Sequence, residues 1–361
     1  MKIVFFGRYG SFDYSNIGGT NSLIRRLAKE LISKLDVQAD YVLYGAPNQI
    51  DIIHKFGIRS RQYISFDNAL HALDEYDHII TIYISLINVF GFLKYYFSNR
   101  KSKRFHTIFQ SWPESFLKRK LFFLTLRLFC LNGIPFVLSP RLLNYARKFN
   151  SQATLLWPPV TDNYFIRLDN KNISDKIRVT FVGRIDKGKG IIETIKLFND
   201  LADRDEVELN LYGTYWTKDP DAVKLHRALS AQKRFRYTEF NFRAYCDEVD
   251  DEICSILRDT DIFIQPYRIL SSTIDTPLLI LEAMASLCAI VTKPYGDIPY
   301  VYGKSKTLFD DINSNKEIIN LILSAKDWLP SERKRVFERL KALDFKSESV
   351  AHEFIDKMAN R

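Results

Sequence analysis

The chain has 361 residues, of which 46% are hydrophobic and 26% charged, and its formal net charge is +9. This composition excludes a disordered protein, and the length is too great for one ordinary hydrophobic core, so we expect two globular domains. The four cysteines show neither metal-type spacing nor a disulfide framework, which predicts reduced core residues in a cytoplasmic protein; they are Cys130, Cys246, Cys254 and Cys288. The six histidines are scattered without ligand spacing, so we expect no metal.

Two apolar stretches raise the question of a membrane-spanning segment. Residues 79–93 end at Lys94 and fall short of the roughly 20 residues that a spanning helix needs. Residues 121–138 are interrupted by Arg127 and by Gly133-Ile134-Pro135. Neither stretch predicts a transmembrane helix, and the apolar run at residues 1–6 is too short for a signal peptide.

The positive charge is concentrated in one aromatic-rich third of the chain. Its basic residues are Lys94, Arg100, Lys101, Lys103, Arg104, Lys118, Arg119, Lys120 and Arg127. Cations among Phe, Tyr and Trp suit an anionic membrane surface, and they also suit nucleic acid or a merely solvated face. Nucleic acid is the least favoured of these partners, because no recognition motif accompanies the charges.

In chain order, the amino-terminal half reads as alternating strands and helices. Residues 2–7 predict a strand, a loop with Gly18 and Gly19 follows, and leucines recur at helical spacing from Leu23 to Leu35. Further strands are predicted at residues 41–44, 78–82, 107–109 and 135–138. Strands that alternate with helical segments indicate a parallel sheet with crossover connections.

After the rigid connector Trp157-Pro158-Pro159, the pattern begins again. A strand is predicted at residues 178–182, with a loop to Gly190 and a helix behind it, and more strands follow at residues 207–212, 262–265 and 289–292. We therefore predict two doubly wound α/β domains, at residues 1–160 and 161–345. Residues 346–361 are expected to form a helix that packs back on the first domain.

The first chemical signal is the sequence FVGRIDKGKG at residues 181–190, which follows a strand and opens a helix. Glycines allow a tight turn and close approach to a ligand, and a helix amino terminus attracts anions. Arg184 and Lys189 add two cations, so a diphosphate would suit this loop. It is neither a Walker loop nor a dinucleotide fingerprint, and a purely structural glycine turn remains the alternative.

The second signal is IDTPLLILEAMA at residues 274–285. Thr276 is expected to cap a helix, with Pro277 at its first position. Glu282 would then be a lone carboxylate in an apolar helix, which is costly unless it has partners. Sugar hydroxyls or a buried structural hydrogen bond would both serve.

Together these residues resemble retaining glycosyltransferases of family 4 (glycosyl transferases group 1). The resemblance implies the GT-B fold, in which two Rossmann-like doubly wound domains face each other across a cleft. Gly18-Gly19 after the first strand and Gly296 with Pro299 downstream agree with it. The match covers most of residues 1–345 and is loosest at residues 40–135.

The resemblance also implies roles for individual residues. Arg184 and Lys189 would neutralise the departing diphosphate, Glu282 would accept hydrogen bonds from the donor ribose, and no metal would be required. The remaining donor contacts would come from Gly18, Gly19, Gly183, Thr276, Pro277 and Leu278. On the acceptor or membrane side we expect Gln110, Trp112, Lys118, Arg119 and Lys120.

Two departures from the family pattern concern the transferred sugar. A Glu that usually contacts this sugar is replaced by Ile274, and the nearest carboxylate is that of Asp275. We expect Asp275 to contact the sugar in its place, from one residue further on and with a shorter side chain; the alternative is a site that binds its sugar differently. A His that usually faces the donor is replaced in the segment from Phe109 to Trp112, where Gln110 can form a hydrogen bond but cannot exchange protons.

The sequence thus predicts a cytoplasmic retaining glycosyltransferase, with peripheral binding to the inner face of the membrane as an alternative location. It would move a sugar from a UDP- or GDP-sugar to a saccharide or lipid-linked acceptor, in polysaccharide or glycoconjugate synthesis. A catalytically silent homologue that serves as a binding or assembly subunit is the main alternative. A sugar epimerase or phosphorylase of the same architecture fits the loop and the Glu helix less well.

Overall fold

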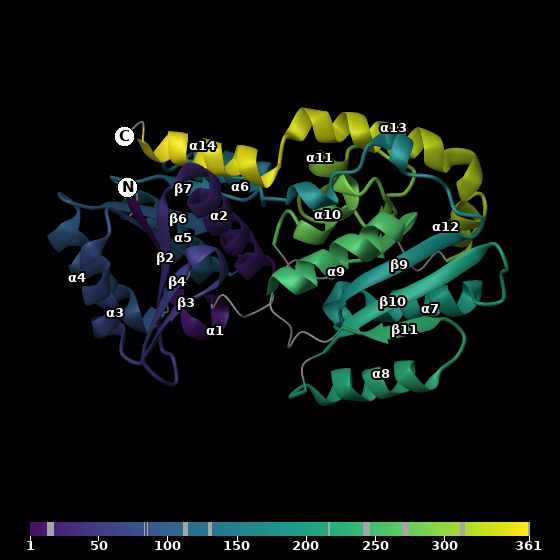
Figure 1. Cartoon of the computed structure of the whole chain (residues 1–361), viewed down its shortest axis with the longest axis horizontal. Coiled ribbons are helices and arrows are strands. Elements are labelled where there is room, and N and C mark those ends of the chain that lie inside the picture. Colours follow the sequence, from purple (N-terminus) through teal and green to yellow (C-terminus); the bar gives the residue numbers. More distant parts are fainter. Residues whose placement is uncertain are drawn as a thin grey trace. The chain divides into compact units, whose positions relative to one another are not determined.

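The computed structural model describes residues 1–12, 18–82, 84, 86–110, 115–128, 132–215, 217–240, 246–268, 274–310 and 315–359 (Figure 1). The chain divides into two units. The N-terminal unit comprises Met1–Thr161 and Phe345–Arg361, and the C-terminal unit comprises Asp162–Asp344. The division therefore lies one residue from the boundary expected at residue 160, and the last residues of the chain return to the first unit.

The N-terminal unit is built on an eight-stranded sheet with the order β3-β4-β2-β1-β5-β6-β7-β8. All neighbouring strands are parallel except β3, which pairs antiparallel with β4. The strands are β1 (Lys2–Arg8), β2 (Gln38–Tyr44), β3 (Ile50–Ile53), β4 (Arg59–Tyr63), β5 (His78–Thr81), β6 (Arg104–Phe109), β7 (Pro135–Val137) and β8 (Thr154–Leu155).

Helices cover both faces of this sheet. They are α1 (Tyr9–Phe12), α2 (Gly19–Leu35), α3 (Phe66–Ala72), α4 (Val89–Asn99), α5 (Phe116–Leu128), α6 (Pro140–Ala146) and α14 (Ser347–Ala359), with 3-10 turns η1 (Lys55–Gly57), η2 (Leu73–Glu75) and η3 (Leu86–Asn88). The terminal helix α14 packs beside α2 (Figure 1), where Ser347 Oγ donates a hydrogen bond to Glu30 Oε1 at 2.9 Å. Phe354 of α14 also contacts Phe136 of β7, with ring centroids 4.7 Å apart.

The C-terminal unit has a parallel sheet of five strands in the order β11-β10-β9-β12-β13. The strands are β9 (Ile177–Arg184), β10 (Val207–Thr214), β11 (Arg236–Glu239), β12 (Ile262–Gln265) and β13 (Ala289–Thr292). The helices are α7 (Ile191–Leu201), α8 (Pro220–Ala231), α9 (Cys246–Asp259), α10 (Leu278–Ala285), α11 (Ile298–Tyr302), α12 (Asn315–Leu323) and α13 (Ala325–Leu343), with 3-10 turns η4 (Asp162–Tyr164), η5 (Leu168–Asn170) and η6 (Lys187–Lys189).

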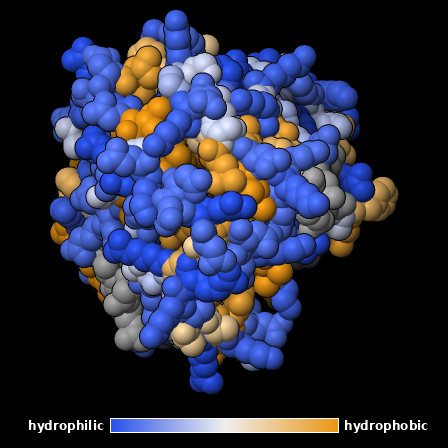
Figure 2. All heavy atoms as spheres, turned by 90° about the vertical axis from the view of Figure 1, so that its right-hand side faces the viewer, coloured by the Kyte–Doolittle hydropathy of each residue, from blue (hydrophilic) through white to orange (hydrophobic). Residues whose placement is uncertain are grey.

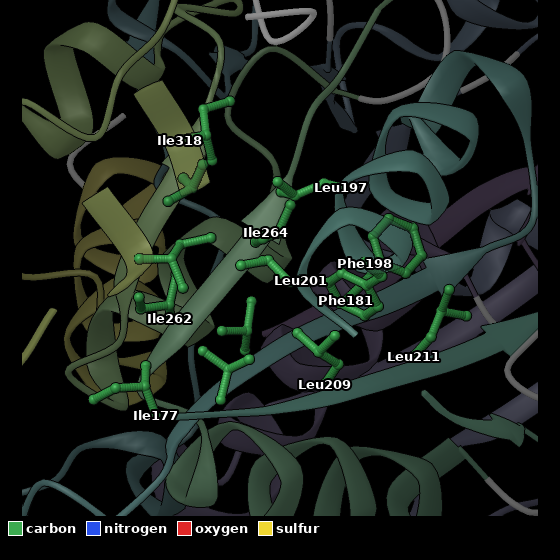
Figure 3. Close-up of a cluster of buried hydrophobic side chains, with 14 of the residues drawn as sticks. Ile177, Phe181, Leu197, Phe198, Leu201, Leu209, Leu211, Ile262, Ile264 and Ile318 are labelled. Carbon is green, nitrogen blue, oxygen red and sulfur yellow. The ribbon is translucent and has the colours of Figure 1, made fainter. Parts of the chain in front are cut away.

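The core of the C-terminal unit explains why its strands are easy to read from the sequence. Both faces of a parallel sheet are covered by helices, so its central strands are nearly continuous apolar runs. Figure 3 shows Phe181 of β9 and Ile264 of β12 meeting Leu197 and Phe198 of α7. Polar residues lie outside, and the face drawn in Figure 2 is mostly hydrophilic with separate apolar patches.

All nine strands predicted from the sequence are present, whereas β3, β4, β8 and β11 were missed. Strand β3 lies at a sheet edge with all four residues exposed, and the edge strand β11 has none of its residues buried. Strand β4 has the polar sequence RSRQY, and β8 has only two residues. Strands β4 and β11 lack the apolar run that identifies a strand buried on both faces, β8 is too short to show one, and β3, with the sequence IDII, is a run of only four residues.

Two sequence expectations about cysteines and membrane spans can be compared with the structure. Cys254 and Cys288 are buried free thiols. Cys130 lies outside the described residues, and Cys246 begins α9. Among the helices that the structure describes, none combines the length and apolar character needed to cross a membrane.

A buried ion pair joins α13 to the sheet of the C-terminal unit. The guanidinium of Arg333 pairs with the carboxylate of Asp261, and both residues are buried. Arg333 also donates to the backbone oxygen of Lys171 at 2.8 Å, and Asp261 accepts from the backbone N–H of Arg178 at 2.9 Å. The pair thereby connects α13, the start of β12 and the start of β9.

We predict that Arg333→Leu lowers the free energy of unfolding by about 3–5 kcal/mol, because it leaves the Asp261 carboxylate buried without its counterion. Urea denaturation would measure the change. Lys341→Ala is the matched control, since Lys341 forms an exposed pair with Glu338 on the same helix and should contribute less than about 1 kcal/mol. Equal midpoints for the two variants would contradict a stabilising role for the buried pair.

Candidate functional site

The C-terminal sheet has a topological switch point between β9 and β12. From β9 the chain proceeds to β10 and β11 on one side, and then returns to β12 and β13 on the other. Ligands of doubly wound folds bind at the carboxyl ends of the strands where this reversal occurs. Arg184 is the last residue of β9, Lys189 ends the turn η6 that follows, and Tyr267 comes directly after β12. The structure therefore places both predicted cations at the switch point.

The loop after β9 is held in one conformation by its own residues. Asp186 Oδ1 accepts a hydrogen bond from the Gly188 N–H at 2.7 Å, while Asp186 Oδ2 lies 2.7 Å from Arg184 Nη2. Gly190 has a φ of +77°, and a Cβ at this position would lie 2.0 Å from the backbone oxygen of Pro266. Only glycine allows this approach, which brings the loop against the segment after β12. Arg268 N–H closes the contact by donating to Gly188 O at 3.0 Å.

Lys189 differs from its neighbour Lys187 in both environment and partners. Lys187 is exposed and forms an ion pair with Asp221 at 2.8 Å. Lys189 Nζ instead lies 5.0 Å from the ring centroid of Tyr267, and within the described part of the chain it forms no ion pair. Burial first and the charge of Arg184 second lower the pKa of Lys189, which is about 7 after the opposite effect of Asp186. A bound anion would supply the counterion that Lys189 lacks.

Helix α10 begins one residue later than the sequence predicted. The expectation of a Thr276 cap with Pro277 at the first helical position is wrong, because Pro277 is itself the N-cap, with extended backbone (φ −64°, ψ 127°). Its carbonyl accepts the N–H of Ile280 at 3.0 Å. Proline has no side-chain acceptor, so within the described part of the chain the first amides of α10, including that of Leu278, receive no side-chain cap from the N-cap residue.

Glu282 is buried in the middle of α10, as the sequence predicted. Its carboxylate is one of the charges that raise the pKa of the Tyr267 hydroxyl, after burial itself and the neighbouring Tyr295. Tyr267 thus lies between the ammonium of Lys189 on one side and Tyr295, 5.0 Å between ring centroids, on another. The arrangement brings Lys189, Tyr267 and Glu282 into one site.

The segment before α10 is buried and packs on a glycine turn. Asp275 O accepts the N–H of Asp297 at 3.0 Å, and a Cβ on Gly296 would lie 2.5 Å from the same oxygen. Ile274 and Asp275 are both buried, and the hydroxyl of the buried Thr276 has no hydrogen-bond partner among the described residues. The predicted contact of Asp275 with a sugar stays a prediction.

Tyr267 and Arg268 were missed by sequence reasoning. Arg268 forms an ion pair with Glu193 of α7 at 3.0 Å and contacts the loop through its backbone, which adds a third cation beside Arg184 and Lys189. The sequence offered one signal for these two residues, namely their position shortly after the strand predicted at residues 262–265. That strand is the neighbour of β9 in the sheet. That neighbour relation is a property of the sheet order and is not visible in the sequence.

The N-terminal unit has a switch point of its own between β1 and β5, and Gly18 and Gly19 follow β1 at the start of α2. Neither glycine has a positive φ, and a Cβ on either one would meet no described atom within 4 Å. Among the described residues, therefore, nothing requires glycine at these two positions. Gln110, which follows β6, accepts a hydrogen bond from Thr20 Oγ1, so the structure brings Gln110 to this loop.

The remaining predicted residues are located as follows. Gly183 is the penultimate residue of β9. Trp112 lies outside the described residues. Helix α5 contains Lys118, Arg119 and Lys120. The structure describes no contact between these three residues and the Gly18–Gly19 loop. The described residues contain no group of three His, Cys, Asp or Glu side chains able to hold a metal ion.

Residues 176–325 match the family model described as Glycosyl transferases group 1. This region is thus similar to glycosyl transferases group 1. It spans the loop after β9, the segment after β12 and helix α10, so the matched region contains every site residue of the C-terminal unit.

Solved structures of glycosyltransferases match the whole chain. HepE from Anabaena in complex with UDP is 14% identical, with all of both chains covered and a TM-score of 0.71. TarM from S. aureus in complex with fondaparinux, α-GlcNAc-glycerol and UDP is 13% identical, with 99% of each chain covered and a TM-score of 0.63. The catalytic domain of starch synthase IV from Arabidopsis thaliana, bound to ADP and acarbose, is 12% identical, with 99% of each chain covered and a TM-score of 0.65.

These similarities show that the chain has the GT-B fold, as the sequence predicted. A search of curated protein sequences found no match to the chain. The fold is therefore shown, while the individual contacts with a donor belong to the proposals that follow.

The depressed pKa of Lys189 makes stability depend on pH. Between about pH 7 and the ordinary lysine value of 10.5, the unfolded chain holds a proton that the folded chain has lost. We predict that the free energy of unfolding rises with pH over this window, and that Lys189→Met removes this rise. Urea denaturation of both proteins across the window would measure it; parallel stability curves would contradict a desolvated Lys189.

Proposed function

We propose that the chain is a retaining glycosyltransferase that moves a sugar from a UDP- or GDP-sugar to a saccharide or lipid-linked acceptor, in the synthesis of a cell-surface polysaccharide or glycoconjugate. The observation that carries the proposal is the desolvated Lys189 ammonium, without an ion-pair partner in the described residues, at the switch point beside Arg184. A nucleoside diphosphate supplies the missing counterion. The complexes of HepE and TarM with UDP support this donor class.

The chemistry follows from the charges that develop when the anomeric bond breaks. The diphosphate leaves with negative charge, which Arg184, Lys189 and the uncapped amides at the start of α10 stabilise in a preorganised site. Glu282 accepts hydrogen bonds from the ribose hydroxyls, and Asp275 takes the place of the Glu that Ile274 replaces. The acceptor hydroxyl attacks from the face that the diphosphate leaves, and its proton passes to a departing phosphate oxygen.

No protein group is needed as a base in this scheme. The cations of the protein neutralise the leaving group, so we propose that the reaction needs no metal. On the N-terminal unit, Gly18 and Gly19 are the candidates for contact with the donor phosphates, because they follow β1 at the switch point of this sheet and no described atom would crowd a Cβ on either one. Gln110 is the candidate for a hydrogen bond to a sugar. We propose that the enzyme works in the cytoplasm, at the inner face of the membrane.

A catalytically silent homologue that binds a nucleotide sugar is the second candidate. It is favoured by Ile274, a buried apolar side chain at the position where the related enzymes have a sugar-binding Glu. Binding of a nucleotide sugar without turnover, in the presence of candidate acceptors, would favour this function.

We predict that one of UDP, GDP and ADP raises the melting temperature of the protein in the presence of EDTA, and that its sugar conjugates do the same. Arg184→Ala and Glu282→Ala should abolish the shift, because each removes a charged group from the proposed donor site. Thermal denaturation followed by intrinsic fluorescence would measure it, with each variant compared with its own ligand-free melting temperature.

Two control variants are provided by the same strand and loop. Arg178→Ala removes a cation at the opposite end of β9, and Lys187→Ala removes the exposed cation paired with Asp221. Both should retain the shift. A shift that survives in Arg184→Ala, or that is absent for all three nucleotides, would reject the proposed donor site.

We also predict that affinity for the nucleoside diphosphate falls as pH rises above about 7, because free Lys189 loses its proton there and must regain it to pair with phosphate. Lys189→Arg keeps its charge at every relevant pH and should bind with a much weaker pH dependence. Isothermal titration calorimetry in buffers of different ionisation enthalpy would also detect the proton taken up. Identical pH profiles would contradict the assignment.

A further inference from the structure

The net positive charge of the chain comes from the segment that forms the second half of the N-terminal sheet. Residues 78–161 contain twelve Lys and Arg residues and a single acidic residue, Glu114, so the rest of the chain has a slight excess of acidic residues. This segment begins at β5 and ends at Thr161, the last residue of the first stretch of the N-terminal unit. Its strands β5, β6, β7 and β8 are parallel neighbours in that order. Right-handed crossovers therefore place α4, α5 and α6 on the same face of the sheet.

Helix α4 is apolar on two opposite sides. Its inner side packs Phe92 and Tyr96 into the core, where both rings contact Phe105. On the outside, Ile87 just before the helix is 91% exposed and Phe90 is 81% exposed. Burying two such side chains would be favourable by several times the thermal energy, so their exposure marks an interaction surface.

Cations alternate with these apolar side chains at helical spacing. Ile87, Phe90, Lys94, Phe97 and Lys101 recur at intervals of three or four residues, which places them along one side of α4 and its continuation. Lys94, Arg100 and Lys101 are exposed, and the guanidinium of Arg100 lies 5.3 Å from the ring centroid of Phe97. The acidic Asp74 contacts the helix elsewhere, where it accepts a hydrogen bond from the Tyr95 hydroxyl.

Helix α5 repeats the combination of exposed apolar and basic side chains. Phe116 and Leu117 are exposed at its start and Leu124 further along. Lys120 Nζ lies 4.6 Å from the ring centroid of Phe116. The same chemistry thus occurs on two successive helices of one face.

We propose that the outer sides of α4 and α5 dock on an anionic lipid bilayer. Ile87, Phe90 and Phe97 would enter the boundary between headgroups and acyl chains, while Lys94 and Lys101 would contact lipid phosphates. A bilayer interface offers hydrocarbon and negative charge at adjacent depths, which satisfies both kinds of side chain at once. The inference deepens the proposed function, and it rests on that function only for the lipid-linked acceptor that such docking would bring within reach.

Other occupants satisfy only part of this surface. A second copy of the chain in a twofold contact would place the basic residues of α4 against the same basic residues of its partner, which is repulsive. A nucleic acid would pair with the cations but leave Ile87 and Phe90 in water. The combination of charge and apolar side chains therefore favours lipid.

The test is flotation of the full-length protein with vesicles of phosphatidylcholine, with and without phosphatidylglycerol, in the absence of any nucleotide. We expect binding to the anionic vesicles that weakens as salt is raised. The double variant Ile87→Ser with Phe90→Ser should bind about tenfold more weakly, from the loss of buried apolar area. Lys94→Glu with Lys101→Glu should also bind at least about tenfold more weakly, from the lost and reversed charges.

Matched controls come from exposed residues of the same types on other surfaces. Ile53→Thr changes a 74% exposed isoleucine on the edge strand β3, and Lys326→Glu reverses an exposed charge on α13. Both should bind vesicles as the unmodified protein does. The melting temperature and the nucleotide-dependent shift should be unchanged in every variant, so a failure of docking is distinguishable from a failure of the donor site.

Three results would overturn the proposal. The first is the absence of binding to anionic vesicles, and the second is equal binding by the α4 variants and their controls. The third is a dimer in sedimentation velocity that Phe90→Ser converts to a monomer, which would assign the surface to a second copy of the chain.

Discussion

The site of the C-terminal unit depends on one close approach, that of Gly190 to the backbone oxygen of Pro266. No side chain can be accommodated there, because a Cβ would lie 2.0 Å from that oxygen. The contact fixes the loop after β9 against the segment after β12, and it brings Lys189 over the ring of Tyr267. The position of the cation is therefore set by backbone packing, whereas long exposed side chains on loops are usually free to move.

This packing has an electrostatic cost. An ammonium group in a poorly hydrated site, near a second cation and without an ion-pair partner in the described residues, is disfavoured in the ligand-free protein, which is why its pKa is lowered. When an anion binds, its attraction to the ammonium is strong, because water screens this interaction weakly in the site. Asp186 reduces this cost, because it forms an ion pair with Arg184 and accepts a hydrogen bond from the N–H of Gly188.

The two units place their cations differently. In the C-terminal unit, a few cations are held at the carboxyl ends of two adjacent strands, where a small ligand would meet them. In the N-terminal unit, the cations are distributed over the outer sides of helices together with exposed aromatic side chains. The first arrangement suits a compact, highly charged ligand, and the second suits an extended surface. A glycosyltransferase with a soluble donor and a lipid-linked acceptor would need both.

The sequence by itself determined the alternation of strands and helices, the division near residue 160, the Arg184–Lys189 loop and the buried Glu282. These features are local, since a buried parallel strand is an apolar run and a glycine loop between strand and helix has a recognisable composition. It did not reveal the edge strands β3 and β11, or that the helix after Pro277 starts with proline as its cap.

Only the tertiary structure decided which loops meet. The order of the sheet makes β12 the neighbour of β9 although β10 and β11 separate them in the sequence, so the roles of Tyr267 and Arg268 beside Lys189 could not be inferred beforehand. Exposure is likewise a tertiary property. Phe90 and Phe92 are the same residue type two positions apart on one helix, and only the packing of α4 on the sheet buries one and leaves the other in solvent.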